Sequence, residues 1–174
     1  MTDAIHQITM SYKPQQDRML LVVSTRQKVE HRYWLTRRFV AAMWPGFVNA
    51  VESRAEPTAT ASPHAKGAAM AVQHHEAIQA ADMSQPHDED KENRPATNAP
   101  LLVVGGSCTP LKGGGMRLVL DTVEKAQVTL NLTEELVHAF CHQLETLTAR
   151  AEWGLGLTIG DPTVILPEGE RQVH

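Results

Sequence analysis

The sequence has little cysteine and no long apolar run, and each shortage excludes a class of protein. Its only cysteines, Cys108 and Cys141, are too few for a disulfide framework, so stability must come from a packed core. No window approaches the roughly 20 apolar residues that cross a bilayer. Residues 1–5 show no basic segment followed by an apolar run, as a secretory signal would. We expect a cytoplasmic protein with no membrane partner.

A strong excess of charge of one sign is also missing. The chain has 174 residues, a formal net charge of -4 and a pI near 6.1. This is the size of one ordinary soluble domain, without the basic balance of a dedicated nucleic-acid binder. The net charge therefore does not indicate what kind of partner the protein binds.

Large aliphatic residues almost vanish between residues 53 and 100. Ala, Pro, Thr and His dominate there, and the segment ends in a charged run at 87–95. Such a sequence buries too little apolar area to offset the entropy of ordering it. We predict a long disordered linker, and we prefer solvated coil to a transient helix at 68–81 that would carry Met70, Val72 and Ile78.

Before this linker, apolar residues first alternate as in strands and then recur as in a helix. The alternation predicts three antiparallel strands at about residues 8–12, 19–23 and 29–35, joined by short polar turns. After Thr36, a good N-cap residue, apolar residues recur at steps of three and four as far as Val51. This spacing predicts an amphipathic helix.

The same order of elements recurs after the linker. Strands are expected at 101–104, 116–121 and 128–132, and an apolar stripe with helical spacing runs from Leu136 to Ala151 after Thr133. A constant offset of 97 aligns Met19 with Met116 and Thr36 with Thr133 without a gap. Because both caps and both helical stripes fall in register, we predict an internal repeat.

The predicted fold is α+β, with two pseudo-symmetric βββα units at 1–52 and 101–153 that pack together into one compact domain about a pseudo-twofold axis. Each unit has an antiparallel sheet and one amphipathic helix, and the linker at 53–100 joins them. The strand at 19–23 is apolar on both sides, which predicts burial from above and below, and packing would also pair exposed sheet edges. The tail at 154–174 alternates again and offers a candidate edge hairpin.

The two predicted helix starts carry opposite charges. Glu134 and Glu135 favour the positive end of the helix dipole, whereas Arg37 and Arg38 stand where a cation is slightly unfavourable. Two explanations stay open. Either the arginines bind an anion together with free backbone N–H groups, or the two helix starts meet and pair Arg with Glu, which we favour.

A basic and aromatic cluster surrounds the first helix start. The candidate nucleic-acid or anion-binding residues are Arg26, Lys28, Arg32, Trp34, Arg37 and Arg38. A Trp beside an Arg on one strand face is typical of a stacking platform for single-stranded nucleic acid. Paired sheet-plus-helix folds are similar in outline to whirly-type and Pur-type single-strand binders, whose repeats carry four strands. In the alternative interpretation, Trp34 packs under the helix of the other unit and Arg32 only solubilises an edge.

Signatures of catalysis and metal binding are weak. His138, Cys141 and His142 have the i, i+3 and i+4 spacing of a metal site, but Cys141 falls in the apolar stripe and a fourth ligand is missing. The Gly-rich stretch 105–115 fails the residue order of a phosphate loop and indicates a hairpin loop. We expect no catalytic residue, no bound metal and no cofactor.

The sequence thus predicts a non-enzymatic interaction or assembly protein that presents a surface to another macromolecule. A protein partner is favoured over a nucleic acid, with homodimerisation as one form of assembly. The alternative is single-stranded nucleic-acid binding through residues 26–38. An enzyme ranks third, with His31 or His138 as candidate general bases.

Overall fold

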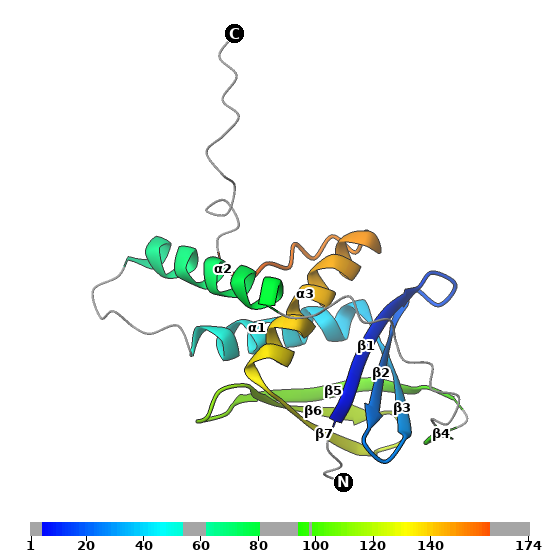
Figure 1. Ribbon diagram of the computed structural model, residues 1–174. Helices are drawn as coiled ribbons and strands as arrows, with labels where there is room; N and C mark the ends of the chain where they lie inside the picture. The colour runs from blue at the N-terminus through cyan, green and yellow to red at the C-terminus, as the bar shows by residue number, and fades with distance from the viewer. Residues whose placement is uncertain (1–4, 54–61, 81–93, 98, 161–174) are drawn as a thin grey trace.

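A computed structural model describes residues 5–53, 62–80, 94–97 and 99–160 of the chain (Figure 1). Its elements are strands β1 (Ile5–Lys13), β2 (Arg18–Thr25) and β3 (Val29–Leu35), helices α1 (Arg37–Glu52) and α2 (Pro63–Ala80), strands β4 (Arg94–Pro95), β5 (Leu101–Pro110), β6 (Met116–Thr122) and β7 (Gln127–Leu132), and helix α3 (Glu134–Arg150). Among the described residues, no helix combines the length and the hydropathy needed to cross a membrane. The fold class is α+β, as the periodicities predict.

The strands form one mixed sheet in the order β1-β2-β3-β5-β6-β7, with the two-residue β4 beside β3. Strands β1, β2 and β3 pair antiparallel, and so do β5, β6 and β7. The two triplets join where β3 and β5 run parallel, with Tyr33 opposite Leu101 and Trp34 opposite Leu102. Two antiparallel meanders therefore share one sheet through a short parallel seam.

Strand alternation decides which face of the sheet forms the core. Met19, Leu21 and Val23 of β2 are at most 1% exposed, whereas Leu20 and Val22 between them are only half-buried. Successive strand residues point to opposite faces, so the helices cover one face alone. The predicted burial of this strand from both sides is therefore realised on one side only.

Helices α1 and α3 lie across the buried face of the sheet, and α2 lies on the side of these two helices that faces away from the strands (Figure 1). The rings of Phe47 and Phe140 stack with their centroids 5.1 Å apart where α1 meets α3. Helix α1 packs on β5, and α3 contacts β1. Each helix thus contacts the first strand of the other meander, and the two triplets share one hydrophobic core.

Thr36 and Thr133 are confirmed as N-cap residues of α1 and α3. The Thr36 hydroxyl oxygen accepts a hydrogen bond from the Phe39 backbone N–H at 3.2 Å, and the Thr133 hydroxyl accepts one from Leu136 at 3.3 Å. Each side chain satisfies one of the backbone donors left free at a helix start. The two helices therefore begin at equivalent positions by the same device.

The second and third strands of the two triplets pair in the same register. Met19 lies opposite Leu35 in the first hairpin, and Met116 lies opposite Leu132 in the second. The first hairpins differ, because the turn that precedes β6 is one residue longer than the turn that precedes β2. The correspondence between the triplets is thus close but incomplete.

The prediction of solvated coil throughout residues 53–100 is wrong for α2. Met70, Ala71 and His74 are buried there, spaced so that they share one helix face, and α2 packs against α3. The Ser62 hydroxyl accepts a hydrogen bond from the Ala65 backbone N–H at 3.2 Å at its start. Packing against α3 stabilises this helix, because its own sequence has too few large apolar residues to form a core. Residues 54–61, 81–93 and 98 of the predicted linker lie outside the described residues.

The candidate edge hairpin is not formed in the described part of the tail. Residues 154–160 contain no strand, because Gly154, Gly156 and Gly160 take φ values of 64°, 57° and 72°, which interrupt an extended chain. Ile159 is buried in the core instead. The second half of the predicted hairpin, at 161–174, lies outside the described residues.

Candidate functional site

The sheet face opposite the helices carries a row of apolar side chains. Leu20, Trp34 and Leu102 lie directly opposite one another across β2, β3 and β5, and all three are half-buried. Val104 continues the row along β5 and is 59% exposed. We call these four residues the outer stripe. The prediction that Trp34 packs under a helix is wrong. Strand alternation places the Trp34 side chain on the face opposite to that of the buried Tyr33.

Basic residues share the sheet face of the outer stripe. Alternation places Lys13, Arg18 and Arg117 on the same face, since their strand neighbours Tyr12, Met19 and Met116 face the core. Residues 1–52 contain seven Lys or Arg against four Asp or Glu, although the whole chain has a net charge of -4. Lys13 and Arg18 lie beside Leu20 at the β2 end of the stripe. Arg117 lies opposite Thr109 at the far end of β5, whereas the acidic Asp121, opposite Gly105, lies next to Val104. Positive charge therefore adjoins the stripe at its β2 end.

Arg32, the basic residue next to Trp34 on this face, is engaged within the protein. Its Nη2 donates a hydrogen bond to the Thr97 carbonyl oxygen at 3.1 Å, and its Nε lies 3.8 Å from Glu30 Oε1. Thr97 follows β4, which pairs with β3. The guanidinium therefore fastens the segment around β4 to β3 and is less available to a partner than the sequence predicts.

The six predicted binding residues do not form one patch. Arg26 and Lys28 lie at the turn before β3, whereas Arg37 and Arg38 begin α1 after it, and the strand between spans about 23 Å at roughly 3.3 Å per residue. Arg26, Lys28, Arg37 and Arg38 are exposed. The structure therefore spreads these residues along the length of β3.

The predicted pairing of the two helix starts is wrong, because α1 and α3 pack antiparallel. Glu134 at the start of α3 lines a small cavity together with Ala50 and Val51 at the end of α1. Arg37 instead lies near Asp17 in the turn between β1 and β2. Hydrogen bonds from Trp153 and Tyr12, together with the charge of Arg37, hold the pKa of Asp17 below its ordinary value.

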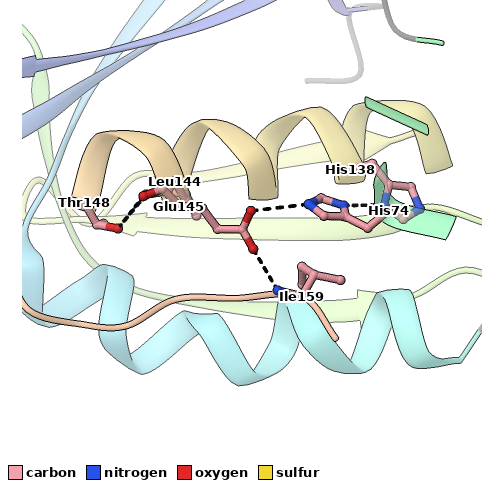
Figure 2. Close-up of polar contacts among 6 residues, drawn as sticks. All are labelled: His74, His138, Leu144, Glu145, Thr148 and Ile159. Carbon is pink, nitrogen blue, oxygen red and sulfur yellow. Dashed lines mark hydrogen bonds and ion pairs between the residues drawn. The ribbon is translucent and has the colours of Figure 1, made fainter. Parts of the chain in front are cut away.

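A buried polar cluster joins α2 to α3, and residue patterns in the sequence do not reveal it (Figure 2). His74 Nδ1 of α2 lies 2.8 Å from His138 Nδ1 of α3, and His74 Nε2 lies 3.4 Å from Glu145 Oε2. The imidazoles are buried, with His74 6% and His138 3% exposed. Glu145 Oε1 also accepts a hydrogen bond from the Ile159 backbone N–H at 2.7 Å.

The candidate metal ligands of α3 do not converge on one point. His138 is turned toward His74, Cys141 is fully buried in the core, and His142 is half-buried. Burial raises the pKa of the Cys141 thiol far above its ordinary value, with the charge of Glu145 acting in the same direction. Within 5–53, 62–80, 94–97 and 99–160, no three His, Cys, Asp or Glu are grouped to hold a metal ion.

Sequence reasoning missed His74 because it lies in a segment with few large aliphatic residues. The available signal was the spacing of Met70, Ala71 and His74. Ala71 follows Met70 by one residue and His74 follows it by four, so the three share one face of a helix. That spacing indicates a helix but does not identify the surface on which it docks. Comparison of the chain with protein-family models, curated proteins and solved structures finds no match.

Proposed function

We propose that this protein is a non-enzymatic interaction and assembly protein that binds a protein partner on the open face of its sheet. The observation that carries the proposal is the outer stripe, a cross-strand row of apolar side chains on a face that the described helices leave uncovered. Burying this row against a partner would remove apolar surface from water, which would stabilise the complex by about 25 cal/mol per Å² of apolar area buried. The stripe supports a docking function more directly than a catalytic one.

The chemistry of the stripe favours a protein partner over a nucleic acid. Nucleobases bind by stacking on aromatic rings, and Trp34 is the only aromatic residue of the stripe. Leu20, Leu102 and Val104 offer aliphatic surface that complements the apolar centre of a protein interface. Arg32, which would clamp a phosphate beside Trp34, is bonded to Thr97.

The charges around the stripe favour a partner with acidic residues at its rim. Lys13 and Arg18 flank the stripe at its β2 end, and rim charges of opposite sign speed and orient association. A second copy carries the same basic residues beside its own stripe, with Asp121 as the acidic residue next to Val104. We therefore favour a different protein, with an aliphatic centre and an acidic rim, over a homodimer formed through this face.

We further propose that the two triplets with their helices are pseudo-symmetric halves of one repeat. A small cavity between the sheet, α1 and α3 is lined by pairs of residues 97 positions apart: Leu21 with Leu118, Met43 with Phe140, and Phe47 with Leu144. Together with the equivalent caps at Thr36 and Thr133, these pairs support a pseudo-twofold axis between α1 and α3. The outer stripe then lies at the seam between the halves.

The test compares partner capture by the full chain and by Trp34→Ala. Proteins retained from the native host are purified, and their affinity for each variant is measured by biolayer interferometry. Because a buried Trp at the centre of an interface contributes about 2 kcal/mol or more, Trp34→Ala should weaken binding of the true partner by about thirtyfold. Thr129→Ala, on the same face of β7 and away from the stripe, should bind as the wild type does.

Two results would overturn the proposal. One is a partner whose affinity is the same for Trp34→Ala, Leu20→Ala and the wild type. The other is turnover by the purified protein that depends on residues outside the stripe. Thermal melts of each variant separate a loss of binding from a loss of folding.

Single-stranded nucleic-acid binding is the second candidate, because Trp34 lies on β3 and exposed basic residues stand at both ends of that strand. A labelled oligothymidylate of about 20 nucleotides, followed by fluorescence anisotropy at low salt, tests it directly. Binding that weakens with salt and is lost in both Trp34→Ala and Arg37→Glu would replace the protein partner by a nucleic acid. Without such binding, this second candidate is removed.

A further inference from the structure

His74 is a buried polar link between α2 and α3. It stands between two residues of α3, with His138 at one ring nitrogen and Glu145 at the other (Figure 2). The fully buried apolar residues of the docked face are Met70 and the small Ala71, and Ile78 on the same face is half-buried. A helix held by so little apolar contact depends strongly on its buried polar contacts.

The contact between the two histidines tolerates only some protonation states. At 2.8 Å, one Nδ1 must donate a proton and the other must accept it. With both rings neutral, His74 donates from Nε2 to Glu145 and accepts at Nδ1 from His138. With one added proton, His74 donates from both nitrogens, toward Glu145 and His138. With a second, two N–H groups and two positive charges face each other, and the contact cannot persist.

We propose that His74, His138 and Glu145 form a proton-operated latch that holds α2 on α3 and opens when both imidazoles are protonated. Glu145 can accept a hydrogen bond from His74 Nε2 whether or not Nδ1 carries a proton, because its carboxylate lies beside that nitrogen. The second proton has no comparable partner at the His74–His138 contact. The latch is therefore closed at neutral pH and opens in mildly acidic solution, where histidine takes up protons.

The groups packed around the latch include one that opposes this direction and several that carry no charge. On α3, Glu134 is the acidic group whose charge raises the pKa of His138. Gln73 of α2 donates a hydrogen bond to the Glu134 carboxylate at 3.5 Å. From α1 and the turn before β6, the cavity beside His138 is lined by Ala50, Val51 and Gly115, which carry no charge. The buried Cys141 thiol nearby stays protonated and neutral, and the tail contributes the Ile159 backbone N–H.

Burial, reinforced by the charge of His74, lowers the pKa of His138 from its ordinary value of 6.5, and Glu134 only partly opposes this. A histidine whose pKa is lower in the folded state takes up its proton more readily after unfolding or undocking. It therefore contributes stability above pH 6.5 that is lost as the pH falls below this value. The sign matches a latch that opens in acid.

Opening the latch would also loosen the end of the described chain. Glu145 binds both His74 and the Ile159 backbone, and the position of a Cβ on Gly160 would fall 2.5 Å from the Gly67 carbonyl oxygen and from the Ala71 nitrogen of α2. Helix α2 and residues 154–160 are thus packed together through one carboxylate and one close backbone approach. We expect both to gain mobility at low pH while the sheet stays folded.

The test is hydrogen–deuterium exchange of the full chain at about pH 7.5 and about pH 5, corrected for the intrinsic pH dependence of exchange. In the wild type, protection of peptides from α2 should fall at least about tenfold relative to peptides from β6 between these values. His138→Asn places an uncharged amide near the position of Nδ1, where it can donate or accept. This variant should keep α2 protected at both pH values.

His75→Asn is the matched control, since it removes an exposed imidazole of α2 that takes no part in the cluster, and it should respond to pH as the wild type does. The proposal is overturned if α2 stays protected at low pH, if β6 loses protection together with α2, or if His138→Asn loses protection as the wild type does. Should His138→Asn fail to fold, the comparison of α2 with β6 in the wild type decides alone.

Discussion

Gly46 of α1 faces Cys108 of β5 at close range, which makes Gly46→Ala the sharpest test of the packing between α1 and β5. A Cβ added at this position would stand 2.7 Å from the Cys108 Cβ and 3.1 Å from its Sγ. Ordinary carbon contacts are about 3.5–4.0 Å, so α1 or β5 must move by about 1 Å to admit it. The methyl group therefore has no room unless the core rearranges.

Two opposing terms set the size of the effect. Replacing glycine by alanine inside a helix gains about 1 kcal/mol of helix propensity. Forcing an extra methyl group into a packed core costs about 1–3 kcal/mol. We expect Gly46→Ala to lower the free energy of unfolding by about 1 kcal/mol, although the same change at an exposed helix position would raise it.

Urea unfolding of the wild type and the variant measures this difference. Ala42→Gly, at an exposed position of the same helix, calibrates the propensity term and should cost about 1 kcal/mol. In Cys108→Gly the opposing Cβ is absent, so adding Gly46→Ala to it should be stabilising, and the double-mutant cycle should show a coupling of about 1–3 kcal/mol. A Gly46→Ala variant that gains the full propensity term would refute the close approach of α1 to β5.

Three further predictions follow from local contacts. Thr36→Ala and Thr133→Ala should each lower the free energy of unfolding by about 1 kcal/mol, measured in urea, and a much smaller loss would contradict the capping hydrogen bonds. The Asp17 carboxylate accepts hydrogen bonds from the Trp153 indole at 2.7 Å and from Tyr12, and both lower the pKa of Asp17. The hydrogen bond between Asp17 and Trp153 should therefore persist above pH 3.8 and be lost as the pH falls below this value. The indole N–H resonance of Trp153 should move below pH 3.8 and not near neutrality. Burial raises the pKa of Cys108 to about 11, so at about pH 8 roughly one thiol in a thousand is ionised and iodoacetamide should label the native protein far more slowly than the urea-unfolded chain; equal rates would refute its burial.

The strands and the two long helices are predictable from the sequence because their signals are local. Met19, Leu21 and Val23 alternate with less buried residues in β2, and threonine caps precede both helical stripes. The offset of 97 aligns strands and threonine caps of the two triplets, because each of these elements is itself marked by a local pattern. Each of these features depends on residues a few positions apart in the chain.

Helix α2 and the arrangement of the candidate sites depend on contacts between residues far apart. His74 is 64 positions from His138, and Arg32 is 65 positions from Thr97, so no local pattern pairs them. The sequence placed Trp34 and Arg32 on one strand face correctly. It could not show that this face lies away from the helices or that Arg32 is bonded within the protein.

The amino-acid sequence by itself determined the α+β class, the order of strands and the positions of the two capped helices, because side-chain periodicity and capping act over a few residues. Only the tertiary structure decided that α1 and α3 run antiparallel, that α2 docks on α3 through His74, and that the described helices leave the outer stripe uncovered. These outcomes depend on which apolar faces cover one another. That choice is made by the packing of the whole chain, because each surface is buried only when a distant segment supplies its partner.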